Sequence, residues 1–189
     1  MHSVWKTSIL FTMITGVLLG LGYPLLVTGI AAVFFPHQAA GSLILKDGQV
    51  IGSELLAQSF TSDRYFHPRT SAAGNGYDAT ASGGSTLAQS NAKLVSRIQG
   101  DIDKLAAQNP GKPVPIDMVT TSGSGLDPDI TPDNAGYQAA RVASARPGLS
   151  LEQVRTLIGK HTAPRQLGFL GEPRVNVLEL NLDLDSTGK

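Results

Sequence analysis

The sequence has 189 residues, which is room for one folded domain and an anchor but hardly for two hydrophobic cores. Its 15 Lys and Arg residues balance its 15 Asp and Glu residues, so the overall charge does not favour binding to nucleic acid. The absence of cysteine excludes disulfides, thiol nucleophiles and Cys-ligated metal sites, and it leaves the compartment open.

The first predicted element is a membrane helix within residues 7–35. This run contains no Asp, Glu, Lys, Arg or His and exceeds the roughly 20 apolar residues that a membrane helix needs. The alternative is a cleaved signal peptide, whose apolar region spans about 7–15 residues and ends in small residues. The run here is longer and closes on bulky Phe34, Phe35 and Pro36. We therefore predict that residues 1–37 form a retained transmembrane anchor.

The charges that flank this anchor favour a cytoplasmic N-terminus by a narrow margin. Lys6 and the α-amine precede the helix, and only Lys46 follows it closely. The domain after the helix is then expected to be periplasmic. Within the helix, Thr12, Gly16 and Gly20 recur every four residues, which is typical of a strip on which another helix packs closely, although glycine is common in membrane helices anyway.

Two residues further along the helix are expected to disturb it. Gly22 and Pro24 interrupt the continuation of the small-residue strip, and proline removes a backbone donor and crowds the preceding turn. We expect the helix to bend there.

Residues 38–189 carry short apolar runs between turn residues, which predicts a small mixed α/β domain. Asp47-Gly48 between two apolar runs is a hairpin signal, and residues 59–85, rich in Gly and Ser but with aromatics, are expected to form a long ordered loop. The later elements expected are a helix capped by Ser90 and running to about Gln108, a strand at Met118-Val119, a helix from Asp133 through Ala145, a helix from Leu151 to about Lys160 with a Ser150/Gln153 capping box, and a bulged strand from Arg174 to Asp185.

Catalytic and metal-binding motifs are sparse in this domain. No P-loop, G-x-S-x-G elbow, H-E-x-x-H or EF-hand pattern occurs, and the four histidines lie far apart in the sequence. Asp127, Asp129 and Asp133 are close enough to hold a cation, but Asp before Pro and Asp at a helix start are also ordinary turn chemistry, which we favour.

One glycine-rich segment is a candidate nucleotide contact. Ser82-Gly83-Gly84-Ser85 precedes a helical region, so its backbone amides are placed to receive an anion. The segment also resembles the S-G-G core of the ABC-transporter signature. Tight turns need the same glycines, and the run from Ser122 to Gly125 has the same status.

Several blocks in order along the chain form a family pattern. They are Gly22-Tyr23-Pro24-Leu25-Leu26, residues 35–43, Tyr65-Phe66-His67-Pro68-Arg69, residues 81–85, Leu126-Asp127, Ile130-Thr131-Pro132 and residues 175–185. Together with a single N-terminal helix, these blocks resemble the C subunit (KdpC) of the bacterial Kdp potassium-transporting ATPase. Three positions depart from the family pattern: Thr70, Thr86 and Ala92 stand where Pro, Asn and Pro, respectively, are usual.

The resemblance implies a non-catalytic accessory subunit of a high-affinity, ATP-driven potassium uptake pump in the bacterial inner membrane. The implied partners are a potassium-selecting channel-like subunit, a P-type ATPase catalytic subunit and a tiny single-span subunit. It also implies a need for this subunit in assembly and activity, and a chaperone-like role in raising the ATP affinity of the catalytic subunit. No firmly bound cofactor is expected, because the partner uses the ATP.

The implied effect on ATP affinity conflicts with direct ATP binding. A periplasmic domain meets essentially no ATP, so direct contact at Ser82–Ser85 requires the opposite orientation. We therefore expect an indirect effect, in which contacts with the partners shift the populations of their conformations. Direct nucleotide binding at this loop remains the alternative. A membrane-anchored hydrolase is a third class, although no serine lies in a nucleophile elbow.

Overall fold

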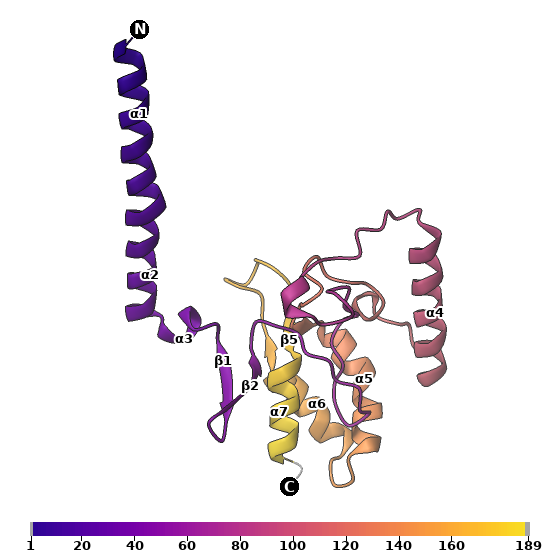
Figure 1. Ribbon diagram of the computed structural model, residues 1–189. Coiled ribbons are helices and arrows are strands. Elements are labelled where there is room, and N and C mark those ends of the chain that lie inside the picture. Colours follow the sequence, from indigo (N-terminus) through magenta and orange to yellow (C-terminus); the bar gives the residue numbers. More distant parts are fainter. Residues whose placement is uncertain (1, 188–189) are drawn as a thin grey trace. The chain divides into compact units, whose positions relative to one another are not determined.

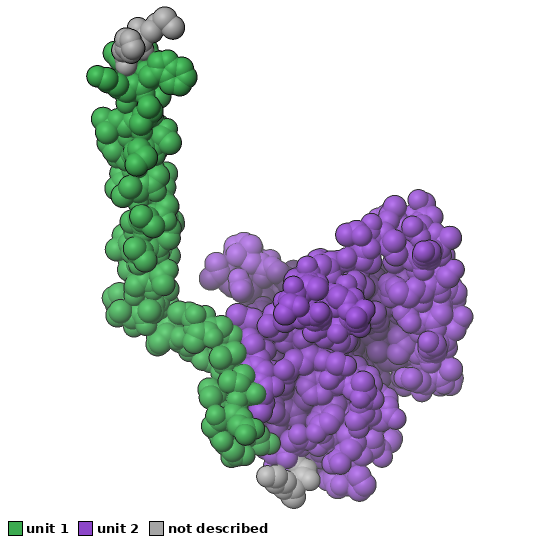
Figure 2. Space-filling model, viewed as in Figure 1, with its two compact units in different colours: residues 1–50 green, residues 51–189 purple. Residues whose placement is uncertain are grey.

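The computed structural model describes residues 2–187. They divide into two compact units, unit 1 up to residue 50 and unit 2 from residue 51 (Figure 2). The division falls inside the second strand of a hairpin. The domain boundary predicted after residue 37 remains a prediction. Each unit is described by itself.

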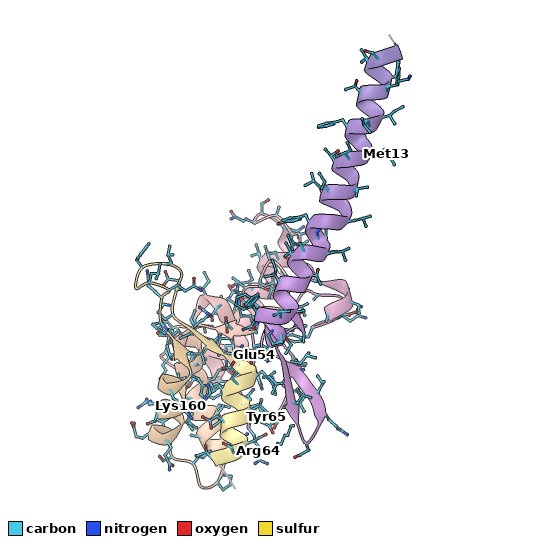
Figure 3. All side chains as sticks on the ribbon, turned by 90° about the vertical axis from the view of Figure 1, so that its left-hand side faces the viewer. Met13, Glu54, Arg64, Tyr65 and Lys160 are labelled. Carbon is cyan, nitrogen blue, oxygen red and sulfur yellow. The ribbon has the colours of Figure 1, made fainter. Side chains whose placement is uncertain are left out.

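Unit 1 consists mainly of one long helix. It comprises α1 (His2–Val17), a π-helical turn η1 (Leu18–Gly22) and α2 (Tyr23–Phe34), and the short helix α3 (Pro36–Ala39) follows. Within residues 2–187, Ser3–Phe34 is the one helix long and apolar enough to cross a membrane, and none of its most apolar stretch is buried. Figure 3 shows side chains such as Met13 projecting from it without packing partners. The fold therefore contains the single apolar helix that the sequence predicts.

The π turn η1 lies directly before Pro24. The N–H of Tyr23 bonds to the carbonyl of Leu18, five residues earlier. A proline ring collides with the carbonyl four residues before it in a regular α-helix, and a widened turn relieves that crowding. The interruption expected at Gly22 and Pro24 is therefore present as a π turn, whereas the bend itself remains a prediction.

A two-stranded hairpin follows α3. It pairs β1 (Leu43–Lys46) with β2 (Gln49–Ser53). Asp47 and Gly48 between them have φ values of 53° and 78°, the two positive angles of a type I′ turn. The predicted Asp-Gly hairpin is confirmed.

Unit 2 has a small antiparallel sheet covered by helices (Figure 1). The strand order is β3 (Asp129–Ile130), β5 (Arg174–Asn176) and β4 (Thr162–Ala163), with Val175 opposite both Ile130 and Thr162. Three helices cover the sheet: α5 (Pro132–Ala145), α6 (Leu151–Lys160) and α7 (Val177–Thr187). Helix α6 packs on both α5 and α7, and α5 and α7 each contact β5. The core is a cluster of buried apolar side chains from these elements and two loops: Phe66, Ile130, Ala135, Ala139, Val142, Leu149, Val154, Ile158, Val175, Val177, Leu180 and Leu184.

Helix α4 (Ala92–Gln108) stands apart from this core (Figure 1). Its apolar residues recur at helical spacing, as predicted, but none of its residues is fully buried. The predicted cap was wrong by one residue, because the side chain of Asn91, not Ser90, accepts the N–H of Lys93 at 2.9 Å. Asparagine is as good a cap as serine, so the local sequence permitted both.

The other predicted helices of unit 2 are present. The Ser150/Gln153 capping box is confirmed, with both reciprocal hydrogen bonds formed. The helix expected from Asp133 begins one residue earlier, at Pro132, where Thr131 caps it through the N–H of Asn134. The strand expected at Met118-Val119 was wrong, since Ile116–Met118 forms the 3-10 helix η3. The long loop expected over residues 59–85 is confirmed except for the 3-10 turn η2 (Ala79–Ala81).

The predicted strand from Arg174 to Asp185 was wrong beyond its first three residues. Only Arg174–Asn176 is a strand, and Val177–Thr187 is helix α7. The Oδ1 of Asn176 accepts the N–H of Glu179 at 3.1 Å, as a helix cap does. The supposed bulge between Val177 and Leu178 is therefore the start of a helix.

Candidate functional site

The family segment Tyr65-Phe66-His67-Pro68-Arg69 is the best-defined loop of unit 2. Two amide side chains hold its backbone as a neighbouring strand would. Asn181 of α7 accepts the N–H of Phe66 at 2.8 Å and donates to its carbonyl at 2.9 Å. Gln138 of α5 does the same for His67, at 2.8 and 3.0 Å. The loop therefore has a fixed shape although it belongs to no sheet.

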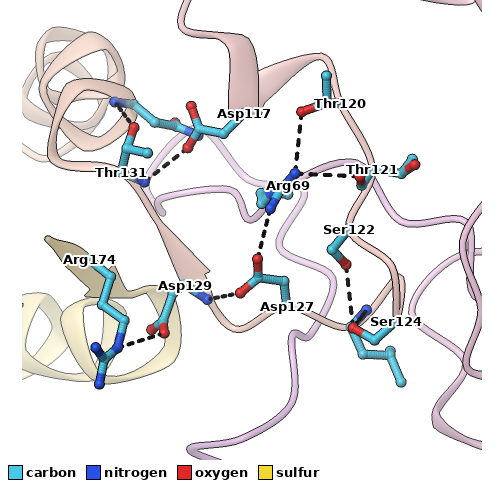
Figure 4. A network of polar contacts seen from close by, with 12 residues as sticks. Arg69, Asp117, Thr120, Thr121, Ser122, Ser124, Asp127, Asp129, Thr131 and Arg174 are labelled. Atoms are coloured by element: carbon cyan, nitrogen blue, oxygen red, sulfur yellow. Dashed lines mark hydrogen bonds and ion pairs between the residues drawn. The ribbon is translucent and has the colours of Figure 1, made fainter. Parts of the chain in front are cut away.

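The hydrogen bonds between Gln138 and the backbone of His67 continue into a chain of buried polar side chains. Gln138 also donates to Asn134 at 2.7 Å, and Asn134 donates to the carboxylate of Asp117 at 2.9 Å. The same carboxylate accepts the backbone N–H of Thr131 at 2.9 Å (Figure 4). Buried polar groups are costly unless paired, so this chain ties the loop to the start of α5.

Two arginines also bond to this segment and to the residue before it. Arg146 donates to the carbonyl of Arg64 at 2.7 Å and to the carboxylate of Asp185 at 2.8 Å, while its side chain is only 4% exposed. Its guanidinium also lies 4.9 Å from the ring centre of Tyr65, whose hydroxyl donates to Asp185. Figure 3 shows Arg64 and Tyr65 beside α7. Arg141 adds a bond to the Tyr65 carbonyl at 3.0 Å.

Arg69, at the end of the segment, joins it to the aspartate-rich turn (Figure 4). Its guanidinium donates to Asp127 at 2.9 Å, to the hydroxyl of Thr120 at 3.2 Å and to the carbonyl of Thr121 at 3.4 Å. The ion pair is 23% and 30% exposed at its two side chains, so it is partly screened by solvent. It joins two loops that are 58 residues apart in sequence.

The three aspartates considered as cation ligands have other contacts. Asp127 accepts the N–H of Asp129 at 3.1 Å, which is turn chemistry, and Asp129 pairs with Arg174 at 3.0 Å (Figure 4). Burial raises the pKa of Asp129 despite that arginine. Asp133 lies in the first turn of α5. Within residues 2–187, no three His, Asp or Glu side chains are grouped closely enough to hold a metal ion.

A cavity of about 490 Å³ lies between α4, α5 and the loop that contains residues 65–69. Its lining includes His67, Tyr77, Lys104 and Arg141. Burial, and to a lesser degree the charge of Arg141, lowers the pKa of His67, which favours the neutral imidazole. Both polar and apolar side chains line the cavity. Gln138 and Arg141, which bond to the backbone of residues 65–67, are among them.

The two glycine-rich segments singled out in the sequence pair with each other. The N–H of Gly83 donates to the carbonyl of Ser124 at 2.8 Å, and the hydroxyl of Ser82 donates to the same carbonyl at 3.0 Å. A Cβ at Gly84 would lie 3.3 Å from the Ser122 carbonyl, and one at Gly125 would lie 2.6 Å from the Gly83 carbonyl. The glycines therefore allow two backbones to approach closely.

This pairing bears on the candidate nucleotide contact Ser82–Ser85. The Gly83 amide already has a protein acceptor. Residues 86–91 separate the segment from the first residue of α4, so the segment is not itself the N-terminus of a helix. Nucleotide contact at these residues remains a prediction.

The helix-packing residues are all on the long helix of unit 1. Thr12 and Gly16 lie in α1, and Gly20 lies in the π turn. A Cβ at Gly16 or Gly20 would meet nothing within 4 Å. Both glycines therefore remain open to another helix, and packing on this strip remains a prediction.

Comparison with known proteins decides the family. The family model described as "KdpC: K+-transporting ATPase, c chain" matches residues 5–186. The chain belongs to the KdpC family. The resemblance carried by Tyr65–Arg69 and the other sequence blocks is thereby confirmed.

Curated relatives agree with the KdpC assignment. A potassium-transporting ATPase KdpC subunit from Koribacter versatilis is 59% identical, over 96% of this chain and 93% of its own length. KdpC subunits from Acidobacterium capsulatum and Rhodopseudomonas palustris are 56% and 50% identical, each over at least 95% of this chain and 96% of the relative. The chain is thus a KdpC-family subunit of a potassium-transporting ATPase, with one candidate membrane span.

Sequence reasoning missed the residues that hold the loop. Asn134, Gln138 and Asn181 are almost completely buried, at 1%, 3% and 1% exposure. A usable signal existed for Asn134 and Gln138, since each is an amide side chain within a predicted amphipathic helix. Gln138 and Asn181 bind a loop that lies 71 and 115 residues earlier in the chain, and Asn134 binds Asp117, 17 residues earlier.

Proposed function

We propose that this KdpC-family chain is a non-catalytic accessory subunit that acts by contact with the ion-selecting and ATP-hydrolysing subunits of the pump. Two observations together carry the proposal: a family match over residues 5–186, and the long apolar helix Ser3–Phe34, whose most apolar stretch is not buried. Such a helix is suited to packing on polytopic partners in a membrane. The folded unit then serves as a contact domain on one side.

The arginines in and around the loop of residues 65–69 support a structural role for that domain. Arg69, Arg141 and Arg146 are each engaged with carboxylates or carbonyls. A catalytic group instead needs an open position beside its substrate. We propose that the loop's fixed shape serves recognition, and that hydrolysis and ion selection belong to the partners.

The proposed orientation places the N-terminus in the cytoplasm and the domain in the periplasm. The weak charge bias of Lys6 supports it. A C-terminal reporter enzyme that functions on only one side of the membrane tests it: periplasmic activity is expected, and cytoplasmic activity contradicts the proposal.

The proposed role in assembly and activity is tested with the whole pump. Purification through a tag on the ATPase subunit in mild detergent is expected to recover this chain together with the channel-like and single-span subunits. A stable and fully active pump isolated without this chain would refute the role. Raised ATP affinity is expected only when the chain is present in the complex, as a lower KM for ATP.

Direct nucleotide binding at Ser82–Ser85 is the second candidate function. Its support is the glycine-rich segment, in which Gly83 has open space around its Cβ position. ATP is titrated against the full chain in detergent, comparing the unaltered protein with Gly83→Asp, which adds negative charge without a steric clash. Saturable binding that Gly83→Asp abolishes supports this candidate, and no saturable signal at millimolar ATP excludes it.

A further inference from the structure

The cavity between α4, α5 and the loop of residues 65–69 has the size of a small-molecule site. Its volume of about 490 Å³ falls within the roughly 300–1,000 Å³ that is usual for ligand pockets. Figure 2 shows unit 2 hollowed between the lobe that carries α4 and the rest of the unit. The proposed function does not use this cavity.

Hydrogen bonds fix the walls of the cavity. The hydroxyl of Tyr137 on α5 donates to the carbonyl of Leu105 on α4 at 2.7 Å, so the two helices that line the cavity are joined to each other. The hydroxyl of Tyr77 donates to the carbonyl of Arg69 at 2.9 Å, which fixes the phenol ring on the loop side. Preformed walls reduce the conformational entropy that is lost when a ligand binds.

Aromatic and apolar side chains form much of the wall. They are Phe60, Pro68, Tyr77, Leu105, Met118 and Tyr137. Phe60, Tyr77 and Tyr137 carry flat rings, and such rings pack well against another ring by offset stacking or edge-to-face contact. A ligand with an aromatic ring therefore suits this wall.

The charged groups at the cavity leave one positive charge uncompensated. The carboxylate of Asp101 pairs with Arg97 at 2.9 Å, and that of Asp63 lies 3.5 Å from the guanidinium of Arg141. Lys104 also lines the cavity, and its ammonium group forms no ion pair or hydrogen bond with any residue of the range 2–187. A ligand with a single negative charge balances this lysine.

The other two basic side chains of the wall are less suited to an anion. The guanidinium of Arg141 already donates to the carbonyls of Asp63 and Tyr65, at 2.8 and 3.0 Å. Burial lowers the pKa of His67, which favours its uncharged form. Lys104 is therefore the cation of the wall that remains for a ligand.

We propose that this cavity binds a small aromatic carboxylate, whose ring packs against the aromatic wall and whose carboxylate pairs with Lys104. A ligand cation is disfavoured, because both carboxylates of the wall already have arginine partners. The inference does not rest on the proposed function, since every lining residue belongs to unit 2.

The first test compares probes of similar shape and different charge. Phenylacetate, phenylacetamide and 2-phenylethylammonium are each titrated into the full chain in mild detergent by isothermal titration calorimetry, with detergent alone as the blank. Saturable binding of phenylacetate is expected, at least about threefold tighter than that of the other two probes. No saturable binding at about 10 mM phenylacetate, or equal affinity for the three probes, overturns the proposal.

The second test places the probe in the cavity. Lys104→Met removes the charge but keeps an unbranched side chain, and it is expected to weaken phenylacetate binding at least about threefold without changing that of phenylacetamide. Lys93→Met is the matched control, because Lys93 lies on the same helix outside the lining, and it should bind as the unaltered chain does. Equal phenylacetate affinity of the two variants overturns the proposal.

A third variant fills the cavity. Thr61 lines it with an exposed side chain, so Thr61→Trp adds bulk there without disturbing the core. Binding of both phenylacetate and phenylacetamide should be lost, while the melting temperature stays unchanged. If Thr61→Trp retains its melting temperature and binds both probes normally, they occupy another surface and the proposal is wrong.

Discussion

Asn181 in α7 hydrogen-bonds both backbone groups of Phe66, which lies 115 residues earlier in the chain. Its Oδ1 accepts the Phe66 N–H at 2.8 Å, and its Nδ2 donates to the Phe66 carbonyl at 2.9 Å. Phe66 and Asn181 are both almost completely buried, so no solvent replaces these bonds. The pair fixes the phenyl ring in the core and holds the family segment in place.

Asn181→Ala is therefore expected to destabilise unit 2 by about 3 kcal/mol, because two buried backbone groups lose their partners. The measurement is urea-induced unfolding of the full chain in mild detergent. Gln99→Ala serves as the control, since Gln99 bonds only to the exposed neighbour Asp103, and it should change stability by less than about 0.5 kcal/mol. If Asn181→Ala lowered the free energy of unfolding by less than about 1 kcal/mol, the two hydrogen bonds to Phe66 would not stabilise unit 2 as proposed.

Gly125 and Gly83 should respond very differently to alanine. Gly125 has a φ of 68°, and its added Cβ would lie 2.6 Å from the Gly83 carbonyl and 2.7 Å from the Ala73 nitrogen. Both atoms belong to the backbone and cannot yield easily. We expect Gly125→Ala to cost about 2–4 kcal/mol and Gly83→Ala, with nothing within 4 Å, to be close to neutral. Thermal unfolding of both variants checks this, and equal melting temperatures would refute the close approach.

Thr86 offers a stabilising substitution. Its φ of 51° places a β-branched residue in the left-handed region, where asparagine is tolerated much better. Thr86→Asn is expected to raise stability by about 1 kcal/mol. The hydroxyl of Thr86 bonds only to the exposed carbonyl of Ser85, so little is lost with it. The control Thr80→Asn, at a position with ordinary φ, should not stabilise the protein.

The contact of α6 with α7 should weaken in acid. Lys160 and His161 each hydrogen-bond the carboxylate of Asp183 at 2.8 Å, and these bonds, that of Lys160 first, lower the pKa of Asp183 from 3.8 to about 2. Because the folded-state pKa is depressed, this stabilisation is complete above about pH 4 and is lost as the pH falls through about 2.

Asp183→Asn tests that dependence. Its free energy of unfolding should fall less steeply than that of the unaltered chain between about pH 4 and pH 2. The measurement is denaturant unfolding at a series of pH values. Parallel pH profiles for the two proteins would show that Asp183 does not contribute in this window.

The small-residue strip predicts a contact inside the membrane. Gly16→Leu together with Gly20→Leu leaves the isolated helix intact, since a Cβ at either position meets nothing within 4 Å. The bulky side chains should keep a partner helix away and reduce recovery of this chain with the pump at least about fivefold. Gly29→Leu is the matched control, because Gly29 is equally open but outside the strip. Equal recovery of the two variants would mean that the strip is not the contact.

The apolar helix, the hairpin turn and the capping box could be predicted from local sequence. Residues 7–35 lack every ionisable side chain, and a bilayer-length apolar helix follows from that fact alone. The hairpin at Asp47-Gly48 and the capping box of Ser150 with Gln153 are likewise satisfied by neighbours a few residues away. Local hydrogen bonds and local φ preferences determined these elements, so no knowledge of distant contacts was needed.

The tail shows where a local pattern is ambiguous. Leucines at positions 178, 180, 182 and 184 alternate as a strand does, yet residues 177, 180, 181 and 184 are buried at helical spacing. In the predicted strand, Asn181 falls between two leucines and therefore on the polar face. It is buried because the backbone of Phe66 provides two hydrogen bonds there, and that choice between helix and strand depends on a contact 115 residues away.

The sequence by itself determined the long apolar helix, much of the turn and cap chemistry and the family. Only the tertiary structure decided which polar side chains are buried, which glycines face another backbone and which leucines remain exposed in the loop between β4 and β5. The physical reason is that burial is a property of pairs of segments. A buried amide or a closely packed glycine is favourable only when a segment distant in sequence contacts it. The sequence of one segment alone does not identify that partner.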